Sequence, residues 1–190
     1  MSNLLPIRSA LISVWHKQGL EPIVRRLNTH GATIYSTGGT ADYLRGLGAH
    51  VVDVADLTGY PSILGGRVKT LHPKVHGGIL ARREEAQDLQ ELAHYEIPEI
   101  DLVIVDLYPF QATVDSGAGE EEVVEKIDIG GIALIRAAAK NFPHVVCVPS
   151  QAYYAQLSEV LEANNGQTSL ADRMALAAAA FEVSSHYDTA

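Results

Sequence analysis

Short apolar runs alternate with longer amphipathic segments along most of this chain. The apolar runs predict strands at residues 9–14, 33–35, 51–54, 102–105 and 145–148. Apolar positions at helical spacing predict helices at 20–28, 120–126, 131–140, 152–163 and 170–184. A further helix is predicted after residues 36–40, and it ends at Leu47. Strands that alternate with helices are typical of an α/β protein. The pattern therefore predicts a three-layer α/β/α fold with a mainly parallel central sheet.

One long segment shows neither the apolar run of a buried strand nor the apolar spacing of a helix. Residues 56–76 are rich in Gly, Pro, Lys and His, and we interpret them as an irregular loop. A loop of that length inside a compact domain usually carries function. In parallel sheets between helical layers, ligands bind at the carboxyl ends of the strands. The search for chemistry therefore concentrates on this loop and on the residues that follow each predicted strand.

Length and composition indicate one globular domain over residues 1–190, with its C-terminal helices starting at about residue 152. Hydrophobic residues make up 47% of the chain and charged residues 19%, which excludes a disordered protein. No apolar stretch is long enough for a membrane span, and the N-terminus does not resemble a signal peptide. We expect a cytoplasmic protein. Cys147 lies in an apolar run, which favours a buried structural thiol over a nucleophile.

The formal net charge of −9 disfavours a nucleic-acid-binding protein, because such a protein needs a basic face. A small phosphorylated ligand stays compatible with that charge, since a pocket can be locally basic. The first candidate for such a pocket is Ser36-Thr37-Gly38-Gly39-Thr40, between a predicted strand and a predicted helix. Glycine amides, hydroxyls and a helix N-terminus together suit a phosphate. An ordinary glycine turn with Thr40 as the helix N-cap is the alternative.

A second candidate is the block Gly65-Gly66-Arg67-Val68-Lys69-Thr70-Leu71-His72-Pro73. In an extended backbone Arg67 and Lys69 point to the same side, where two cations suit a phosphate or an oxyanion. A solvated basic loop is the alternative. His72 and His76 are four residues apart, but Pro73 disturbs the helix that would aim both at one ion, and a third ligand is missing. The sequence predicts no metal site.

Two further segments carry polar groups next to predicted elements. Asp106 and Tyr108 follow the strand at 102–105, where a turn with packed aromatic residues is the alternative. Asp128 precedes the helix at 131–140, and Lys140 ends it. Each could serve only as a charge that complements the helix dipole.

The order of these blocks is more specific than any one of them. Ser-Thr-Gly-Gly-Thr, Gly-Gly-Arg-Val-Lys-Thr-Leu-His-Pro, Leu-Tyr-Pro-Phe and Asp-Ile-Gly-Gly with Arg-Ala-Ala-Ala-Lys-Asn follow one another in the chain. In this order they closely resemble the IMP cyclohydrolase domain of bifunctional AICAR formyltransferase/IMP cyclohydrolases, over about residues 8 to 188. The opening at 10–14 and the ending from Phe181 to Asp188 are similar too. The resemblance implies a methylglyoxal-synthase-like fold.

The resemblance also implies a reaction: dehydrative ring closure of 5-formamidoimidazole-4-carboxamide ribonucleotide to IMP, without a metal or organic cofactor. By analogy with that family, Asp128 would hold the carboxamide and help remove its proton, while Lys140 would polarise the formyl oxygen. Lys69 and Tyr108 would form a proton-relay and orienting pair. The remaining substrate-binding positions, mostly for the 5′-phosphate, would be Ser13, Lys17, Ser36, Thr37, Gly38, Gly39, Thr40, Arg67, Thr70, Asp106 and Gly130.

The resemblance further implies a homodimer with sites near the subunit interface. In the bifunctional enzymes a larger formyltransferase domain follows this one. The chain is therefore interpreted either as a free-standing cyclohydrolase supplied by a separate formyl-transferring enzyme or as a fragment.

Two segments depart from the family pattern. The family usually has Ser-Val-Ser-Asp-Lys-Thr-Gly where this chain has Ser-Val-Trp-His-Lys-Gln-Gly, so that Trp15 and His16 replace a serine and an aspartate. Asp106 stands where the family has asparagine. A carboxylate only accepts hydrogen bonds, whereas an amide also donates. If Asp106 lies close to Asp128, one of the two pKa values rises.

Two other functions stay open. Methylglyoxal synthase shares the fold but lacks the Arg-Val-Lys-Thr-Leu-His-Pro block. A non-catalytic nucleotide- or effector-binding domain would need the phosphate site but not Lys69, Tyr108, Asp128 and Lys140 together. Their joint presence favours an enzyme.

Overall fold

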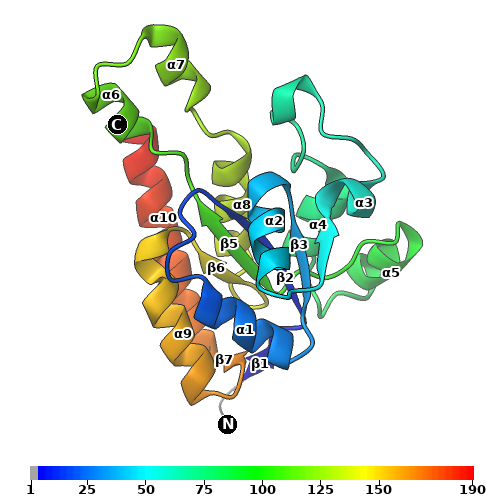
Figure 1. The fold of residues 1–190 in the computed structure, drawn as a ribbon. Coiled ribbons are helices and arrows are strands. Elements are labelled where there is room, and N and C mark those ends of the chain that lie inside the picture. The colour runs from blue at the N-terminus through cyan, green and yellow to red at the C-terminus, as the bar shows by residue number, and fades with distance from the viewer. Residues whose placement is uncertain (1–3) are drawn as a thin grey trace.

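Five parallel strands form the central sheet of this protein, whose computed structural model describes residues 4–190 (Figure 1). They are β2 (Ser9–Val14), β3 (Thr33–Ser36), β4 (Val51–Asp53), β5 (Leu102–Asp106) and β6 (Val146–Val148). Their order across the sheet is β4-β3-β2-β5-β6, and all neighbours are parallel. The predicted α/β class and mainly parallel sheet are confirmed.

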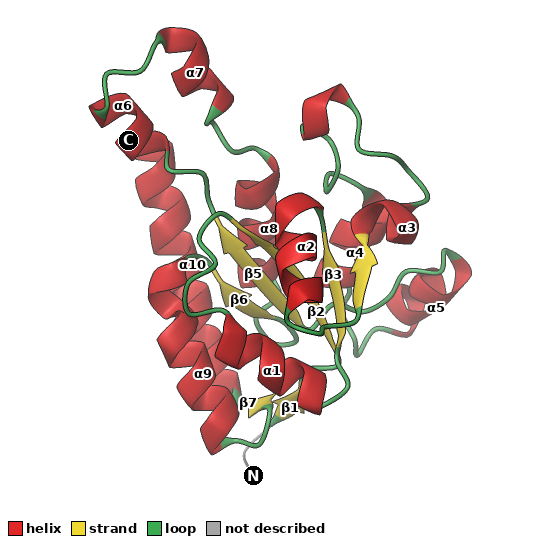
Figure 2. Cartoon of the chain, in the orientation of Figure 1, coloured by secondary structure: helices red, strands yellow, loops and turns green. Residues whose placement is uncertain are grey.

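Helices cover both faces of the sheet (Figure 2). One face packs against α1 (Glu21–Thr29), α2 (Gly38–Gly46) and α9 (Tyr154–Ala163). The other packs against α4 (Pro73–Leu80), α8 (Gly130–Lys140) and α10 (Leu170–Thr189). Because successive residues of a strand point to opposite faces, Ile12 belongs to the first core and Leu11 to the second. The structure therefore has the expected three layers.

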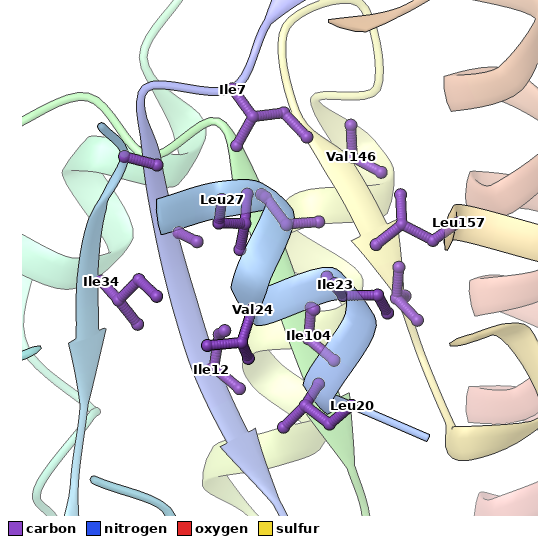
Figure 3. Packing of buried hydrophobic residues seen from close by; sticks show 14 of the residues in the cluster. Ile7, Ile12, Leu20, Ile23, Val24, Leu27, Ile34, Ile104, Val146 and Leu157 are labelled. Carbon is purple, nitrogen blue, oxygen red and sulfur yellow. The ribbon is translucent and has the colours of Figure 1, made fainter. Parts of the chain in front are cut away.

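Helix α1 shows how an amphipathic pattern becomes packing. Its residues Ile23, Val24 and Leu27 are at most 2% exposed and lie over Ile12 and Ile104 of the sheet (Figure 3). Full burial of one such side chain stabilises the fold by about 1.5–3 kcal/mol. The polar side of the helix faces solvent, which is why the sequence period alone located this helix.

The direction of winding changes between β2 and β5, the two central neighbours. The helix after β2, α1, lies on one face, whereas α8, which connects β5 to β6, lies on the other. We call the gap at the carboxyl ends of β2 and β5 the switch point. Loops diverge at such a point and leave room for a ligand. Residues 15–20 and 107–109 border it.

The predicted irregular segment at 56–76 is wrong at both ends. Helix α3 (Val54–Thr58) enters it, and α4 begins at Pro73 after a 3-10 turn η1 (Leu64–Gly66). Pro73 starts this helix rather than disturbing one, because proline suits the first helical turn. The N-cap is His72, whose Nδ1 accepts a hydrogen bond from the Lys74 amide at 3.1 Å.

Several short elements had no clear sequence signal. They are α5 (Ala86–His94), α6 (Phe110–Asp115), the 3-10 turn η2 (Gln151–Tyr153) and a small antiparallel sheet of β1 (Leu5–Pro6) with β7 (Gln167–Thr168). The predicted helix at 120–126 is present as α7 (Glu120–Glu125). Within residues 4–190, no helix combines the length and the apolar character that a membrane span requires. Cys147 is buried, which raises the pKa of its thiol to about 12 and confirms a structural role.

Candidate active site

Asp128 lies at the N-terminal end of α8, at the carboxyl edge of the sheet. Its Oδ1 accepts a hydrogen bond from the Gly131 amide at 2.6 Å. Burial raises the pKa of this carboxyl above its ordinary value of 3.8, while the Gly131 amide, the Lys69 ammonium and the Tyr108 amide act in the opposite direction. Asp106 is not among the charges that shift this pKa, so the coupling expected between the two carboxylates is not found. A half-buried acid with a raised pKa suits proton transfer near neutral pH.

Two glycines make this arrangement possible. A Cβ on Gly131 would lie 2.6 Å from Oδ2 of Asp128, and a Cβ on Gly130 would lie 2.9 Å from Oγ1 of Thr70. Both distances are too short for a side chain. Gly130 and Gly131 therefore let the carboxylate of Asp128 and the loop that carries Thr70 approach the first turn of α8 closely.

Tyr187 is a site residue that the sequence analysis did not identify. Its hydroxyl accepts a hydrogen bond from the Asp128 amide at 2.8 Å and donates one to the Lys126 carbonyl at 2.9 Å. Burial raises the pKa of Tyr187, so the phenol stays a donor. The end of α10 thereby fixes the segment that precedes α8. The only sequence signal was the similarity of the chain's ending to the family.

The loop before α4 brings its two cations to different partners. The backbone at Arg67 is in the right-handed helical region, so residues 67–69 form a turn and not the extended segment considered above. Arg67 forms an ion pair with Glu125 at the end of α7. The charge of Lys69 instead acts on Asp128. Thr70 is buried next to Gly130. Lys69, Thr70, Asp128 and Gly130 therefore belong to one cluster.

Tyr108 belongs to an exposed aromatic group at the switch point. Its ring lies edge-on to that of Trp15, with centroids 5.4 Å apart. The Nζ of Lys126 lies 5.3 Å from the centroid of Trp15 and 6.0 Å from that of Tyr108. Trp15 is 46% exposed and so does not turn into the core. These three residues form a surface that can contact a planar ligand.

Hydroxyls at the strand ends are already bonded to the backbone. Ser36 is fully buried, and its Oγ donates to the Ile12 carbonyl at 2.7 Å. Thr40 Oγ1 donates to the Val14 carbonyl at 3.0 Å. These two side chains join β2 to the β3–α2 connection, so a phosphate there would have to bind the backbone amides instead. Ser13 is half-buried beside Val105 in the register of β2 and β5.

The first turn of α2 does present open amides. Thr37, not Thr40, is the N-cap, and its side chain makes no capping hydrogen bond. Gly38 and Gly39 are exposed, and Gly38 has a positive φ of 53° that favours glycine. The first turn of α2 carries no acidic residue. Unpaired amides and the helix dipole at this end suit an anion. Lys17, whose Nζ donates to the Trp15 carbonyl at 3.4 Å, adds a cation to the neighbouring loop.

Asp106 turns toward the other side of the switch point. Its Oδ2 lies 2.7 Å from both the backbone nitrogen and the Nδ1 of His16, and its Oδ1 accepts a hydrogen bond from the Gln151 amide at 3.3 Å. The Asp106 side chain is 8% exposed. Both oxygens of the Asp106 carboxylate therefore already have hydrogen-bond partners within the protein.

Lys140 is the candidate that the fold separates from the others. It is exposed at the C-terminal end of α8, whereas Asp128 precedes the N-terminal end. The helix runs from Gly130 to Lys140, which at 1.5 Å per residue places its ends about 15 Å apart. Within one chain, Lys140 therefore lies near the amino ends of the strands, away from Asp128, Lys69 and Tyr108.

The candidate site is open to solvent, since Trp15 is 46% and Tyr108 39% exposed, and Gly38 and Gly39 are exposed as well. Two surface hollows of about 550 and 560 Å³ lie beside α5, the first between α3, α4 and α5 and the second on α5 itself. Neither is lined by a candidate site residue. No cluster of three or more His, Cys, Asp or Glu side chains suited to a metal ion occurs in the part of the chain that the structure describes.

Comparisons with known proteins show the family and the fold of the chain. The MGS-like domain family matches residues 19–133, and the AICARFT/IMPCHase bienzyme family matches residues 138–190. The bifunctional purine biosynthesis protein PurH of Bacteroides thetaiotaomicron is 57% identical over 190 residues, and that of Rhodospirillum rubrum is 52% identical. Each match covers this whole chain but only 38% and 36%, respectively, of the relative. The crystal structure of ForH is similar with a TM-score of 0.79 and 40% identity, covering 96% of this chain and 95% of that one.

Proposed function

The chain belongs to the family of MGS-like domains and matches the AICARFT/IMPCHase bienzymes in its C-terminal part, and from this premise we propose that it is an IMP cyclohydrolase. Its substrate is 5-formamidoimidazole-4-carboxamide ribonucleotide. The carboxamide nitrogen attacks the formyl carbon, and the carbinol that forms loses water to give IMP. The PurH relatives carry purine biosynthesis in their name, which supports this choice of substrate.

The observation that carries the proposal is the environment of Asp128. An amide nitrogen is a weak nucleophile, so ring closure needs a group that accepts its proton. Burial raises the pKa of Asp128 and makes the carboxylate a stronger base, while the Gly131 amide holds Oδ1 in place at 2.6 Å. Asp128 therefore holds the carboxamide and removes its proton.

Lys69 and Tyr108 act beside this base. The Lys69 charge is close enough to Asp128 to stabilise the ionised carboxylate, and the Tyr108 amide does the same. The negative charge that develops on the former formyl oxygen needs a donor or a cation near it. The ammonium of Lys69 and the hydroxyl of Tyr108 supply these, and because the attack is intramolecular the site must also hold the two reacting groups in orientation.

The 5′-phosphate of the nucleotide binds at the first turn of α2. The amides of Gly38 and Gly39 and the positive end of the helix dipole attract it, and Lys17 adds a charge. This end of the sheet also contains Thr37, Thr70 and Arg67, although Arg67 must exchange its ion pair with Glu125 to reach a ligand.

Lys140 serves a site on a second copy of the chain. A lysine about 15 Å along α8 from Asp128 cannot act on the same formyl group within one chain. In a homodimer, the exposed Lys140 of one copy can face the open site of the other. The open character of the candidate site supports this arrangement, because catalysis of dehydration benefits from a site that excludes bulk water.

A non-catalytic nucleotide-binding domain is the second candidate. The observation in its favour is the aromatic group at the switch point, where Trp15 stands in place of a small hydroxyl residue. Such a domain would bind IMP but would not form it.

The test is an absorbance assay for IMP formation from the formamido ribonucleotide, with no metal or cofactor added. We expect turnover by the wild type and a loss of about 10²–10⁴-fold in the Asp128→Asn variant, the usual contribution of a general base. Asp42→Asn, a change at a side chain that is 80% exposed on α2, is the matched control and should leave the rate unchanged. A folded wild type that binds IMP without turnover would support the binding domain instead.

A further inference from the structure

His16 and Asp106 connect the two loops that border the switch point. The residues are 90 positions apart in the chain, yet Asp106 Oδ2 lies 2.7 Å from both the amide and the ring Nδ1 of His16. The carboxylate is 8% exposed and the imidazole 45% exposed. A carboxylate that is nearly buried must be satisfied by donors, and His16 supplies two of them.

Further hydrogen bonds fix the loop after β2 next to this contact. The Trp15 amide donates to the Asp106 carbonyl at 3.2 Å, which continues the β2–β5 pairing beyond Val14. Tyr154 Oη donates to the His16 carbonyl at 3.3 Å, and Gln151 Nε2 donates to the Gln18 carbonyl at 2.9 Å. The path of residues 15–18 is therefore set by β5 and by the start of α9, with the Asp106 carboxylate at the centre.

What this loop presents is the aromatic ring of Trp15. The ring lies edge-on to Tyr108, and the Lys126 ammonium is 5.3 Å from its centroid. Nearly half of the Trp15 surface stays exposed, although a tryptophan has a large apolar area that is usually covered. Hydrogen bonds hold the Trp15 loop in place at the border of the switch point. The exposed ring of Trp15 can therefore contact a planar ring of a ligand bound there.

We propose that Trp15 is a specificity-determining residue that contacts the imidazole or purine ring of the bound ribonucleotide, and that His16 and Asp106 are positioning residues that hold it beside Tyr108. This inference rests on the proposed function for the identity of the ligand. Two of the positions that depart from the family pattern, His16 and Asp106, contact each other directly.

The chemistry of the pair defines an exchange experiment. His16→Asp alone places two carboxylates against each other, which like charges disfavour. Adding Asp106→Asn removes this repulsion, because the asparagine side chain is neutral and its amide nitrogen can donate to the new carboxylate. The double variant also has the pair that the family usually carries at these positions.

Trp15 is the sole tryptophan of the chain, so its fluorescence reports on this loop directly. We expect His16→Asp to shift the emission to longer wavelength, to increase quenching by acrylamide and to weaken IMP binding about tenfold. The double variant should recover the wild-type emission and bind IMP within about threefold of the wild type. KM should change far more than kcat, because the pair positions a binding surface and not the base.

The matched control is His144→Gln. His144 Nε2 lies 2.6 Å from Glu84, so this histidine also pairs with a carboxylate, but it precedes β6 at the opposite end of the sheet. It should leave Trp15 emission and IMP binding unchanged. Equal defects in the single and double variants would overturn the positioning role. Trp15 emission that does not respond to saturating IMP would overturn the contact. Normal responses in a protein without turnover would instead refute the cyclohydrolase and leave this inference in place.

Discussion

The two ends of the central sheet hold carboxylates in contrasting surroundings. At the amino end, Asp101 precedes β5 and is 6% exposed. Its carboxylate accepts hydrogen bonds from the Arg8 amide at 2.7 Å, the Ser9 amide at 3.1 Å and the Arg83 guanidinium at 2.5 Å. At the carboxyl end, burial raises the pKa of Asp128, whose Oδ1 accepts a hydrogen bond from the Gly131 amide, and the Lys69 charge and the Tyr108 amide also act on this carboxylate.

The difference separates a carboxylate that the fold itself satisfies from one that is suited to the proposed catalysis. Asp101 has a cation and several donors from the chain itself, so the charge is fully compensated inside the protein. Asp128 keeps a raised pKa beside a lysine, at the edge of an open site, which leaves it able to exchange a proton. The two residues differ in burial as well as in the number and the type of their partners.

Lys140 provides the largest test of this comparison, because it is a proposed catalytic group at the amino end. We expect Lys140→Ala to reduce turnover about 100-fold or more, as for loss of one group that stabilises a developing oxyanion. Mixing it with Asp128→Asn, followed by subunit exchange, should restore part of the activity if each site uses residues of two copies. The hybrid then contains one site with both groups intact. The measurement is the IMP-forming rate before and after exchange.

No recovery in the hybrid would show that Lys140 and Asp128 do not act together across an interface. A preparation of each variant alone, taken through the same exchange procedure, is the control for recovery caused by refolding. Full activity of Lys140→Ala by itself would make this lysine only a charge that complements the C-terminal end of α8.

Asp101→Ala should sharpen the contrast through stability. Removing this carboxylate leaves Arg83, which is 18% exposed, without its closest partner, and the free energy of unfolding should fall by about 3 kcal/mol. The IMP-forming rate per folded molecule should stay unchanged, because the amino end of β5 is far from the candidate site. Urea unfolding and the absorbance assay measure the two quantities.

Glu99→Ala is the matched control for Asp101. Glu99 lies 3.6 Å from the same Arg83 but is 41% exposed, so its loss should cost less than about 1 kcal/mol. If Asp101→Ala also lowers the free energy of unfolding by less than about 1 kcal/mol, solvent screens the Asp101–Arg83 pair as well. The contrast between the carboxylates at the two ends of the sheet would then be lost.

The fold was largely predictable from the sequence because its signals are local. Buried parallel strands read as apolar runs, and β5 at 102–106 was located to within one residue. Helix α4 was missed because Pro73 was interpreted as a disturbance, although proline at the first turn begins a helix. Helices α5 and α6 are short and border loops, where polar composition hides the helical period.

Most residues of the candidate site were predictable, although Tyr187 was missed, but their arrangement was not. The grouping of Lys69 with Asp128 follows from blocks that each lie next to an element end. The contact between His16 and Asp106 spans 90 residues, and no local pattern indicates it. The length of the predicted helix at 131–140 already places Asp128 and Lys140 at opposite ends, but the sequence analysis followed the resemblance and assigned both residues to one site.

The smallest expected effect is the pH dependence of stability that Asp128 contributes. Burial, the largest cause, raises the pKa of this carboxyl in the folded protein above its ordinary value of 3.8. A group with a raised pKa contributes stability that is fully present below its ordinary pKa and is lost as the pH rises through the raised value.

The Asp128→Asn variant has no titrating side chain at this position. The unfolding free energy of the variant minus that of the wild type should therefore increase as the pH rises above about 4 and then level off. Urea unfolding of both proteins across this range measures the difference, in which the other titrating groups cancel. A difference that falls with rising pH would mean that Lys69 and the two amides outweigh burial.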